Sequence, residues 1–325
     1  DIGKNKNPRL ELQAHIGEGR LDAHGYLRLK RGEITRGFGR LKIHNIPLTF
    51  LEHGTTLETL NGSITTHLNQ DKSWQSFGHI SLQAEQRNEL ELRGKVTGTP
   101  AKFFKIDDMV LNINNAGALQ LGGQCPQKDT CEIDINSKNL NVNPILLLLG
   151  HDKAKLTTNN QLQSLAIQTT WNDQLFSSHG EISWPSFDYM LDTTNLNNAI
   201  HIDAGTLVFN NLQKQADHQW TLEKAELTNQ DDHLEISLNK AHYNNQDIHL
   251  PLTLNNTSLW LPLSKLIAFQ LGISPPSGEG TMEGNFELNI DANKRMQARI
   301  AMDASQADIR WQEVVKPQGI TLQVN

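Results

Sequence analysis

Apolar side chains occupy every second position of this chain, in runs that recur from one end to the other. The runs cover residues 10–16, 21–29, 80–84, 248–254, 286–290, 296–302 and 320–324. Successive side chains of a β-strand point to opposite faces, so each run predicts a strand with one apolar and one polar face. Such one-sided strands are typical of antiparallel sheets, whereas the strands of covered parallel sheets are apolar throughout. The function of the chain therefore depends on what covers the apolar face.

The composition suits a sheet that keeps one face in water. Hydrophobic residues make up 37% of the 325 residues and aromatic residues 6%, and the mean hydropathy is -0.49. These values are low for a chain of this length with a thick two-layer core. The net charge of -7 is spread along the chain. Because no basic stripe is present to neutralise phosphates, we expect no nucleic-acid partner.

Short polar sequences that favour turns separate the apolar runs. They include Asn61-Gly62, Asn114-Asn115-Ala116-Gly117 and Asn210-Asn211, and we also expect Asp107-Asp108 and Asp231-Asp232 to lie in turns. Short connections of this kind join antiparallel neighbours. With strands of ordinary length, the chain has room for about 18 to 22 of them.

Two segments break the alternation and resemble each other. Residues 139–144 lead into a Leu-rich stretch that ends at Gly150, and residues 254–262 lead into a second apolar stretch that ends at Gly272. Each has a proline near its start and a glycine where a helix would stop, so both are predicted to be short helices. We expect them to act as buried plugs at the end of a sheet, and their spacing indicates a weak internal repeat.

The chain has no uninterrupted apolar stretch of about 18 residues that could span a bilayer as a helix. The longest candidate, 259–273, contains Pro262, Ser264, Lys265 and Gln270. The sequence begins without Met and stops inside an alternating run. We therefore expect residues 1–325 to form a single elongated β segment excised from a longer protein, with a repeat boundary near 150–160 and any membrane anchor outside it.

The two cysteines, Cys125 and Cys131, flank a turn-forming sequence between two strand-like runs. This spacing predicts a hairpin tip whose ends come within disulfide distance. A disulfide would place the protein in an oxidising compartment. Two unpaired thiols are the alternative, and a metal site would need further ligands that the neighbouring sequence lacks.

The residues that carry catalysis do not form a recognisable pattern. The thirteen histidines are spread almost one to a strand, and no pair has the spacing of a metal-binding motif. The adjacent carboxylates do not suggest an acid–base couple, and no nucleophile elbow or phosphate-binding loop is present. We therefore expect no enzymatic activity, no cofactor and no metal.

The second helical segment carries a resemblance to a known family. The resemblance lies in residues 256–272, in the following Gly278-Glu279-Gly280 strand region, and in the closing Trp311…Lys316-Pro317-Gln318-Gly319. In these residues the chain resembles the C-terminal region of the AsmA-like family of Gram-negative envelope proteins, which includes AsmA, TamB and YhdP. The resemblance implies a mainly β fold: a long, strongly twisted antiparallel sheet curled into an open groove, or half-pipe, with one or two short helices. It also implies a location in the periplasm, tethered to the inner membrane by an N-terminal anchor outside this chain.

Members of the family are thought to carry phospholipids between the inner and outer membranes. The resemblance thus implies a bridge-like lipid-transfer segment, with phospholipids or other acyl-chain lipids as ligands and with both membranes, or their proteins, as partners through other regions. An uncovered apolar face of this size would exceed what a soluble monomer exposes, and acyl chains could cover it. The alternative is a closed β-sandwich or barrel that acts in adhesion, carbohydrate binding or scaffolding. The expected lining of the groove consists of Leu82, Leu92, Leu111, Ile167, Ile202, Ile236, Leu250, Leu252, Phe286, Leu288, Ile300, Ile309 and Leu322.

Overall fold

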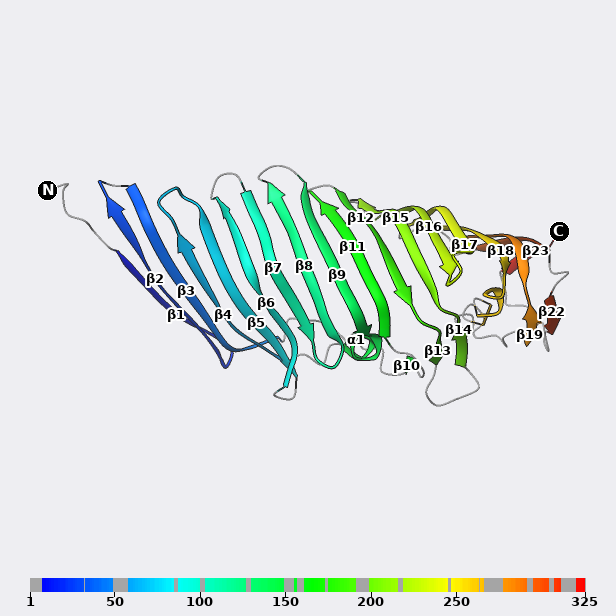
Figure 1. Cartoon of the computed structure of the whole chain (residues 1–325), viewed down its shortest axis with the longest axis horizontal. Coiled ribbons are helices and arrows are strands. Elements are labelled where there is room, and N and C mark those ends of the chain that lie inside the picture. Colours follow the sequence, from blue (N-terminus) through cyan, green and yellow to red (C-terminus); the bar gives the residue numbers. More distant parts are fainter. Residues whose placement is uncertain are drawn as a thin grey trace. The chain divides into compact units, whose positions relative to one another are not determined.

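The structure, a computed structural model, is mainly β (Figure 1). The chain divides into two compact units, Asp1–Asp152 and Lys153–Asn325. This division falls in the range where the sequence suggests a repeat boundary. The structure describes all residues except 1–7, 32, 49–57, 85–86, 100–102, 127–129, 149–154, 157–160, 173–174, 191–198, 216–218, 245–246, 263, 266–276, 291–294, 304–306, 311–319 and 325.

The first unit is an antiparallel meander in which each strand pairs with the next along the chain. Its strands are β1 (Arg9–Ile16), β2 (Gly19–Lys30), β3 (Glu33–Pro47), β4 (Thr59–Leu68), β5 (Trp74–Ala84), β6 (Arg87–Thr99), β7 (Phe103–Ile113), β8 (Gly117–Pro126) and β9 (Cys131–Asn141). A short helix, α1 (Val142–Leu148), follows β9 directly. It begins three residues before Ile145, where the sequence predicted the apolar part of the helix.

The second unit repeats the meander and adds two small sheets. Its main sheet contains β11 (Gln161–Trp171), β12 (Leu175–Trp184), β15 (Gly205–Gln215), β16 (Trp220–Asn229), β17 (Leu234–Tyr243), β18 (Ile248–Thr257), β20 (Met282–Ile290), β21 (Met296–Asp303) and β23 (Ile320–Val324). All of these pair antiparallel with their neighbours except β23, which is parallel to β21. The small sheets are formed by β10 (Lys155–Leu156), β13 (Phe187–Met190) and β14 (Ala199–Ile202), and by β19 (Ser277–Gly280) and β22 (Ala307–Arg310).

The second predicted helix is only partly described. Residues 260–262 and 264–265 are helical, and residues 266–276 lie outside the described residues. The two helical segments begin alike: a left-handed asparagine, Asn139 or Asn256, precedes each. In the first segment, the side chain of Asn141 accepts a hydrogen bond from the backbone N–H of residue 143 at 3.2 Å. In the second segment, the side chain of Thr257 accepts one from the backbone N–H of residue 259 at 3.0 Å. The internal repeat stays a prediction.

Several asparagine and aspartate residues bulge out of the strands rather than forming turns. Asn45, Asp108 and Asn211 have φ values of 47°, 48° and 55° and lie inside β3, β7 and β15. The prediction that Asp107-Asp108 and Asn210-Asn211 form turns is therefore wrong. A bulge adds one residue to a strand, bends it and increases its right-handed twist. These bulges thus twist the sheets locally.

Asn61-Gly62 was also predicted to be a turn but lies inside β4. The side-chain oxygen of Asn61 accepts a hydrogen bond from the backbone N–H of the bulged Asn45 at 2.8 Å. Gly62 lies where the neighbouring strand approaches closely, because a Cβ there would lie 2.5 Å from the carbonyl oxygen of His79. Glycine at this position therefore permits the close strand packing.

We expect Gly62→Ala to lower the free energy of unfolding by about 1–3 kcal/mol, because the added methyl must displace backbone. Gly39→Ala is the matched control, since Gly39 lies on a neighbouring strand and a Cβ there meets no atom within 4 Å. Urea unfolding of both variants measures the difference. Equal stability of the two variants would contradict this account of the glycine.

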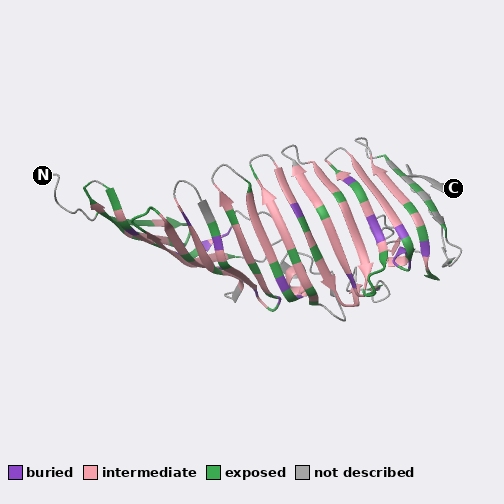
Figure 2. Ribbon diagram, turned by 45° about the horizontal axis from the view of Figure 1, so that its top comes forward, coloured by how far each residue is buried: buried purple, intermediate pink, exposed green. Residues whose placement is uncertain are grey.

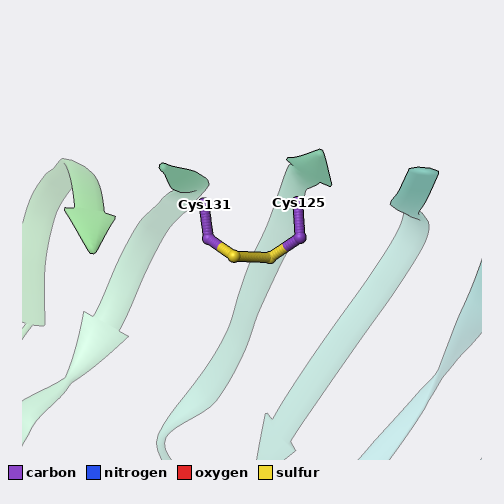
Figure 3. The surroundings of a disulfide bond; sticks show 2 residues. All are labelled: Cys125 and Cys131. Carbon is purple, nitrogen blue, oxygen red and sulfur yellow. A yellow bond between two sulfur atoms is a disulfide. The ribbon is translucent and has the colours of Figure 1, made fainter. Parts of the chain in front are cut away.

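A disulfide joins Cys125, at the end of β8, to Cys131, at the start of β9 (Figure 3). The Cα atoms lie 4.1 Å apart. The register pairs Cys125 with Phe104 of β7, so the disulfide lies on the same face as this residue. It links the last two strands of the first unit at the end of the sheet opposite to α1.

We expect the double variant Cys125→Ser/Cys131→Ser to keep its β-sheet circular dichroism and to lose about 2 kcal/mol of stability, because the disulfide closes a short loop. Chemical denaturation with and without reductant measures the loss. In the serine variant the reductant should have no effect. A loss of the folded state on reduction would contradict this modest structural role.

The well-buried apolar residues of the first unit gather mainly at one end of its strands, the end at which α1 begins. They lie at the end of β3, β5, β7 and β9 or in the adjoining connections, and they include Ile46, Leu48, Ala84, Ile113, Ala116 and Leu140. We call this edge of a sheet the helix end. Figure 2 shows that most other strand residues are of intermediate exposure. The sheet therefore has a buried margin at one end rather than a central core.

Candidate functional site

The strand register of the first unit places its apolar side chains on one face. Directly opposed residues of antiparallel strands project to the same side of a sheet. Leu60 pairs with Leu82, and Ile80 pairs with Leu92, which in turn pairs with Leu111. The same series of pairs extends across β1 to β9 and includes Leu12–Ala23, Leu21–Ile43, Leu41–Ile64 and Leu121–Ile135.

The second unit has the same arrangement. Leu227 pairs with Ile236, Ile236 with Leu254, and Leu252 with Phe286. Further apolar pairs on this face are Leu165–Ile182, Leu207–Leu227, Leu212–Leu222, Leu250–Leu288 and Ile248–Ile290. Each main sheet thus carries a continuous apolar face, and we call these surfaces the apolar face of each unit.

Most residues of the predicted lining belong to these faces. In the first unit they are Leu82, Leu92 and Leu111, and in the second unit they are Ile167, Ile236, Leu250, Leu252, Phe286 and Leu288. Ile300 and Leu322 occupy positions in register with Phe286 and Ala298. Ile202 and Ile309 lie instead on β14 and β22, in the two small sheets.

The apolar faces remain substantially exposed. At the free edge of the first unit, Leu10, Leu12 and Leu27 are 67%, 53% and 38% exposed. Farther along, Leu82, Leu92 and Leu111 are half-buried. In the described part of each unit the main sheet is a single layer, with no second large sheet packed face to face. The described residues therefore leave much of each apolar face accessible.

The second helical segment covers the helix end of the apolar face in its unit. Leu259 and Trp260 are 6% and 5% exposed and pack in one cluster with Ile236, Leu254 and Met282. The indole N–H of Trp260 donates to the carbonyl of residue 280 at 3.0 Å. The described start of this segment is thus buried on the sheet, and we call it the plug.

A row of aromatic residues lies at the opposite end of the second unit's apolar face. Trp171 pairs with Phe176, and Trp220 pairs with Tyr243. Between Phe176 and Trp220 lies Lys214, which pairs directly with both. Sequence reasoning missed this row because its aromatic members come from four strands, with Lys214 on a fifth, and only the register brings them together.

The opposite faces of the sheets carry ion pairs at alternate residues of single strands. Arg93 lies 2.8 Å from Glu91, and Lys105 lies 3.0 Å from Asp107. The hydrogen bond from Lys105 lowers the pKa of Asp107, and the Thr97 hydroxyl lowers it further. Within the described residues, no group of three potential ligands is placed to hold a metal ion. These charges serve to hydrate the polar face.

His201 of β14 has a raised pKa. Its Nδ1 lies 2.6 Å from Asp188 of β13, and its Nε2 lies 3.4 Å from Asp203. The hydrogen bond to Asp188 raises the pKa of His201 above its ordinary value near 6.5. At a pH below 6.5 the charged imidazolium therefore stabilises the pairing of β13 and β14. This contribution is lost as the pH rises through the raised pKa of His201.

We expect an NMR titration to show the pKa of His201 above 6.5 and the Asp188→Asn variant to bring it back toward that value. An unchanged His201 titration in Asp188→Asn would contradict the assigned cause.

No family model matches the chain, and no curated protein or solved structure shows significant similarity to it. Among the described residues, no helix has both the length and the apolar character needed to cross a membrane. The features that bear on function are therefore the two apolar faces, the plug and the aromatic row.

Proposed function

We propose that this chain is a lipid-transfer segment, in which the apolar faces curl into an open groove that shields phospholipid acyl chains. The observation that carries the proposal is the register: in each unit it keeps apolar residues on one face of a single-layer sheet across successive strands. A face of this size on a soluble protein marks a surface that another apolar molecule covers. Acyl chains provide such cover without directional contacts, at about 0.8 kcal/mol for each buried CH₂ group.

The dimensions of the sheets agree with this ligand. The strands of the second unit's main sheet are mostly ten or eleven residues long, which corresponds to about 33–36 Å at about 3.3 Å per residue. One leaflet of a bilayer has about 15 Å of hydrocarbon, half of the usual core. An acyl chain can therefore lie on the face between the two ends of the strands.

The bulges and close glycine contacts favour a curled sheet, since both increase local bending and twist. The resemblance to the AsmA-like family supports the same function and implies a periplasmic location between the inner and outer membranes. The disulfide fits such an oxidising compartment. The closed sandwich, the competing interpretation, requires a second layer that the described residues do not supply.

A charge on the apolar face tests the proposal. We expect Leu92→Asp to remain folded, because an open face leaves the carboxylate hydrated, and to lose co-purifying lipid by at least several-fold. Val110→Asp is the matched control: Val110 lies next to Leu111, the partner of Leu92, but projects to the polar face opposite Arg93. Circular dichroism reports the fold, and mass spectrometry of extracted lipid reports binding.

The outcomes separate the two interpretations. An unfolded Leu92→Asp beside a folded Val110→Asp would indicate a closed core, where an unpaired charge costs several kcal/mol. A folded Leu92→Asp that retains as much lipid as the control would contradict the groove. Wild-type protein free of lipid after exposure to phospholipid vesicles would also contradict it.

A further inference from the structure

We propose that Lys214 and the aromatic residues around it bind the phosphate of a lipid headgroup. This inference rests on the proposed function and deepens it by assigning the position of the headgroup on the second unit. Its basis is a cation, Lys214, that lies among the aromatic and aliphatic residues of this face, at the end of the strands opposite to the plug.

The register fixes the position of Lys214. It lies two residues after Leu212 of the apolar face and directly opposite both Phe176 and Trp220. Its ammonium group lies 5.4 Å from the centroid of the Trp220 ring, and the rings of Phe176 and Trp220 meet edge to face at 6.1 Å. The lysine is half-buried, and in the described part of the molecule no carboxylate lies within ion-pair distance of it. Within the described residues, its charge thus lies at the margin of the apolar face without an acidic partner.

This setting differs from that of the other lysines for which the structure records an ionic or ring contact. Lys105 and Lys224 pair with Asp107 and Glu226 at 3.0 and 2.7 Å on the polar faces. Lys95 also lies over a ring, that of Phe77 at 5.8 Å, but it is on the polar face and near the carboxylate of Asp107. Lys214 therefore has the position from which an ammonium group can bind an anion whose apolar part lies on the sheet.

The aromatic row has the character of a lipid–water boundary. Trp171 and Phe176 are paired on β11 and β12, and Trp220 and Tyr243 are paired on β16 and β17, with Lys214 of β15 between the two pairs at the same end of the sheet. Tryptophan and tyrosine rings favour the level of the headgroups, where one side of the ring is apolar and its polar atom reaches water. A lysine beside such rings attracts an anionic headgroup.

The length of the face gives the lipid an orientation. The plug buries Ile236 and Leu254 at the helix end, and Lys214 is near the other end of β15, nine residues from its first residue. Nine residues of strand cover about 30 Å, which exceeds the about 15 Å of hydrocarbon in one leaflet. A lipid with its phosphate at Lys214 can therefore direct its acyl chains toward the plug without reaching it.

Dioctanoyl phosphatidic acid and dioctanoyl glycerol test the site, because they share acyl chains and differ in the phosphate. Native mass spectrometry of the whole chain with each probe gives the two affinities. We expect the wild type to prefer the phosphatidic acid by about fivefold, Lys214→Met to lose this preference while still binding dioctanoyl glycerol, and Lys214→Arg to retain it. Lys95→Met is the matched control, since it removes one charge and one ring contact from the polar face, and it should retain the preference.

Each outcome has a distinct meaning. A preference that survives in Lys214→Met, or that falls equally in Lys95→Met, overturns the headgroup site while leaving the proposed function in place. Failure of the wild type to bind either probe contradicts the proposed function itself. Displacement of the phosphatidic acid by an equal concentration of inorganic phosphate would show a site for the free anion and overturn the assignment to a lipid headgroup.

Discussion

The structure depends on one constraint, the parity of the strand register. Because side chains alternate between faces, a slip of one residue would move every apolar side chain of a strand to the polar side. The bulges preserve the parity where the sequence breaks it. Ile43 and Ile46 are three residues apart in β3, yet they pair with Gly62 and Leu60, which are two apart. The extra residue is absorbed at Asn45, which adopts the left-handed conformation.

The same parity explains which parts of the fold could be predicted. Alternation identifies strands and their apolar side from the sequence alone, and most predicted lining residues do lie on the apolar faces. It cannot distinguish a turn from a bulge, because both can place a residue in the left-handed conformation, which Asn, Asp and Gly adopt most readily. Asn210-Asn211 and Asp107-Asp108 were therefore misassigned. Only pairing with a strand distant in sequence decides whether the chain reverses or continues at such a point.

The candidate site shows a similar limit. Alternation says which face a residue occupies but not which sheet, so Ile202 and Ile309 could not be separated from the main lining by their pattern. The aromatic row was missed for the opposite reason. Trp171 ends one strand and Trp220 begins another, and in the sequence Lys214 has the pattern of an ordinary polar residue near a turn. Their common position arises only when β11, β12, β15 and β16 are in register.

A face that binds acyl chains must also satisfy its own polar atoms, because hydrocarbon offers no hydrogen bonds. Two pairs of hydroxyl groups on the apolar faces meet this requirement. Thr66 and Ser76 lie 2.7 Å apart in the first unit, and Thr169 and Ser178 lie 3.3 Å apart in the second. Since each pair is bonded within the sheet, replacing water by an acyl chain breaks no hydrogen bond between these hydroxyls. In the proposed groove, such pairs would allow polar residues to remain on a face that acyl chains cover. Lys214, for which the described residues supply no carboxylate partner, would instead bind the anion.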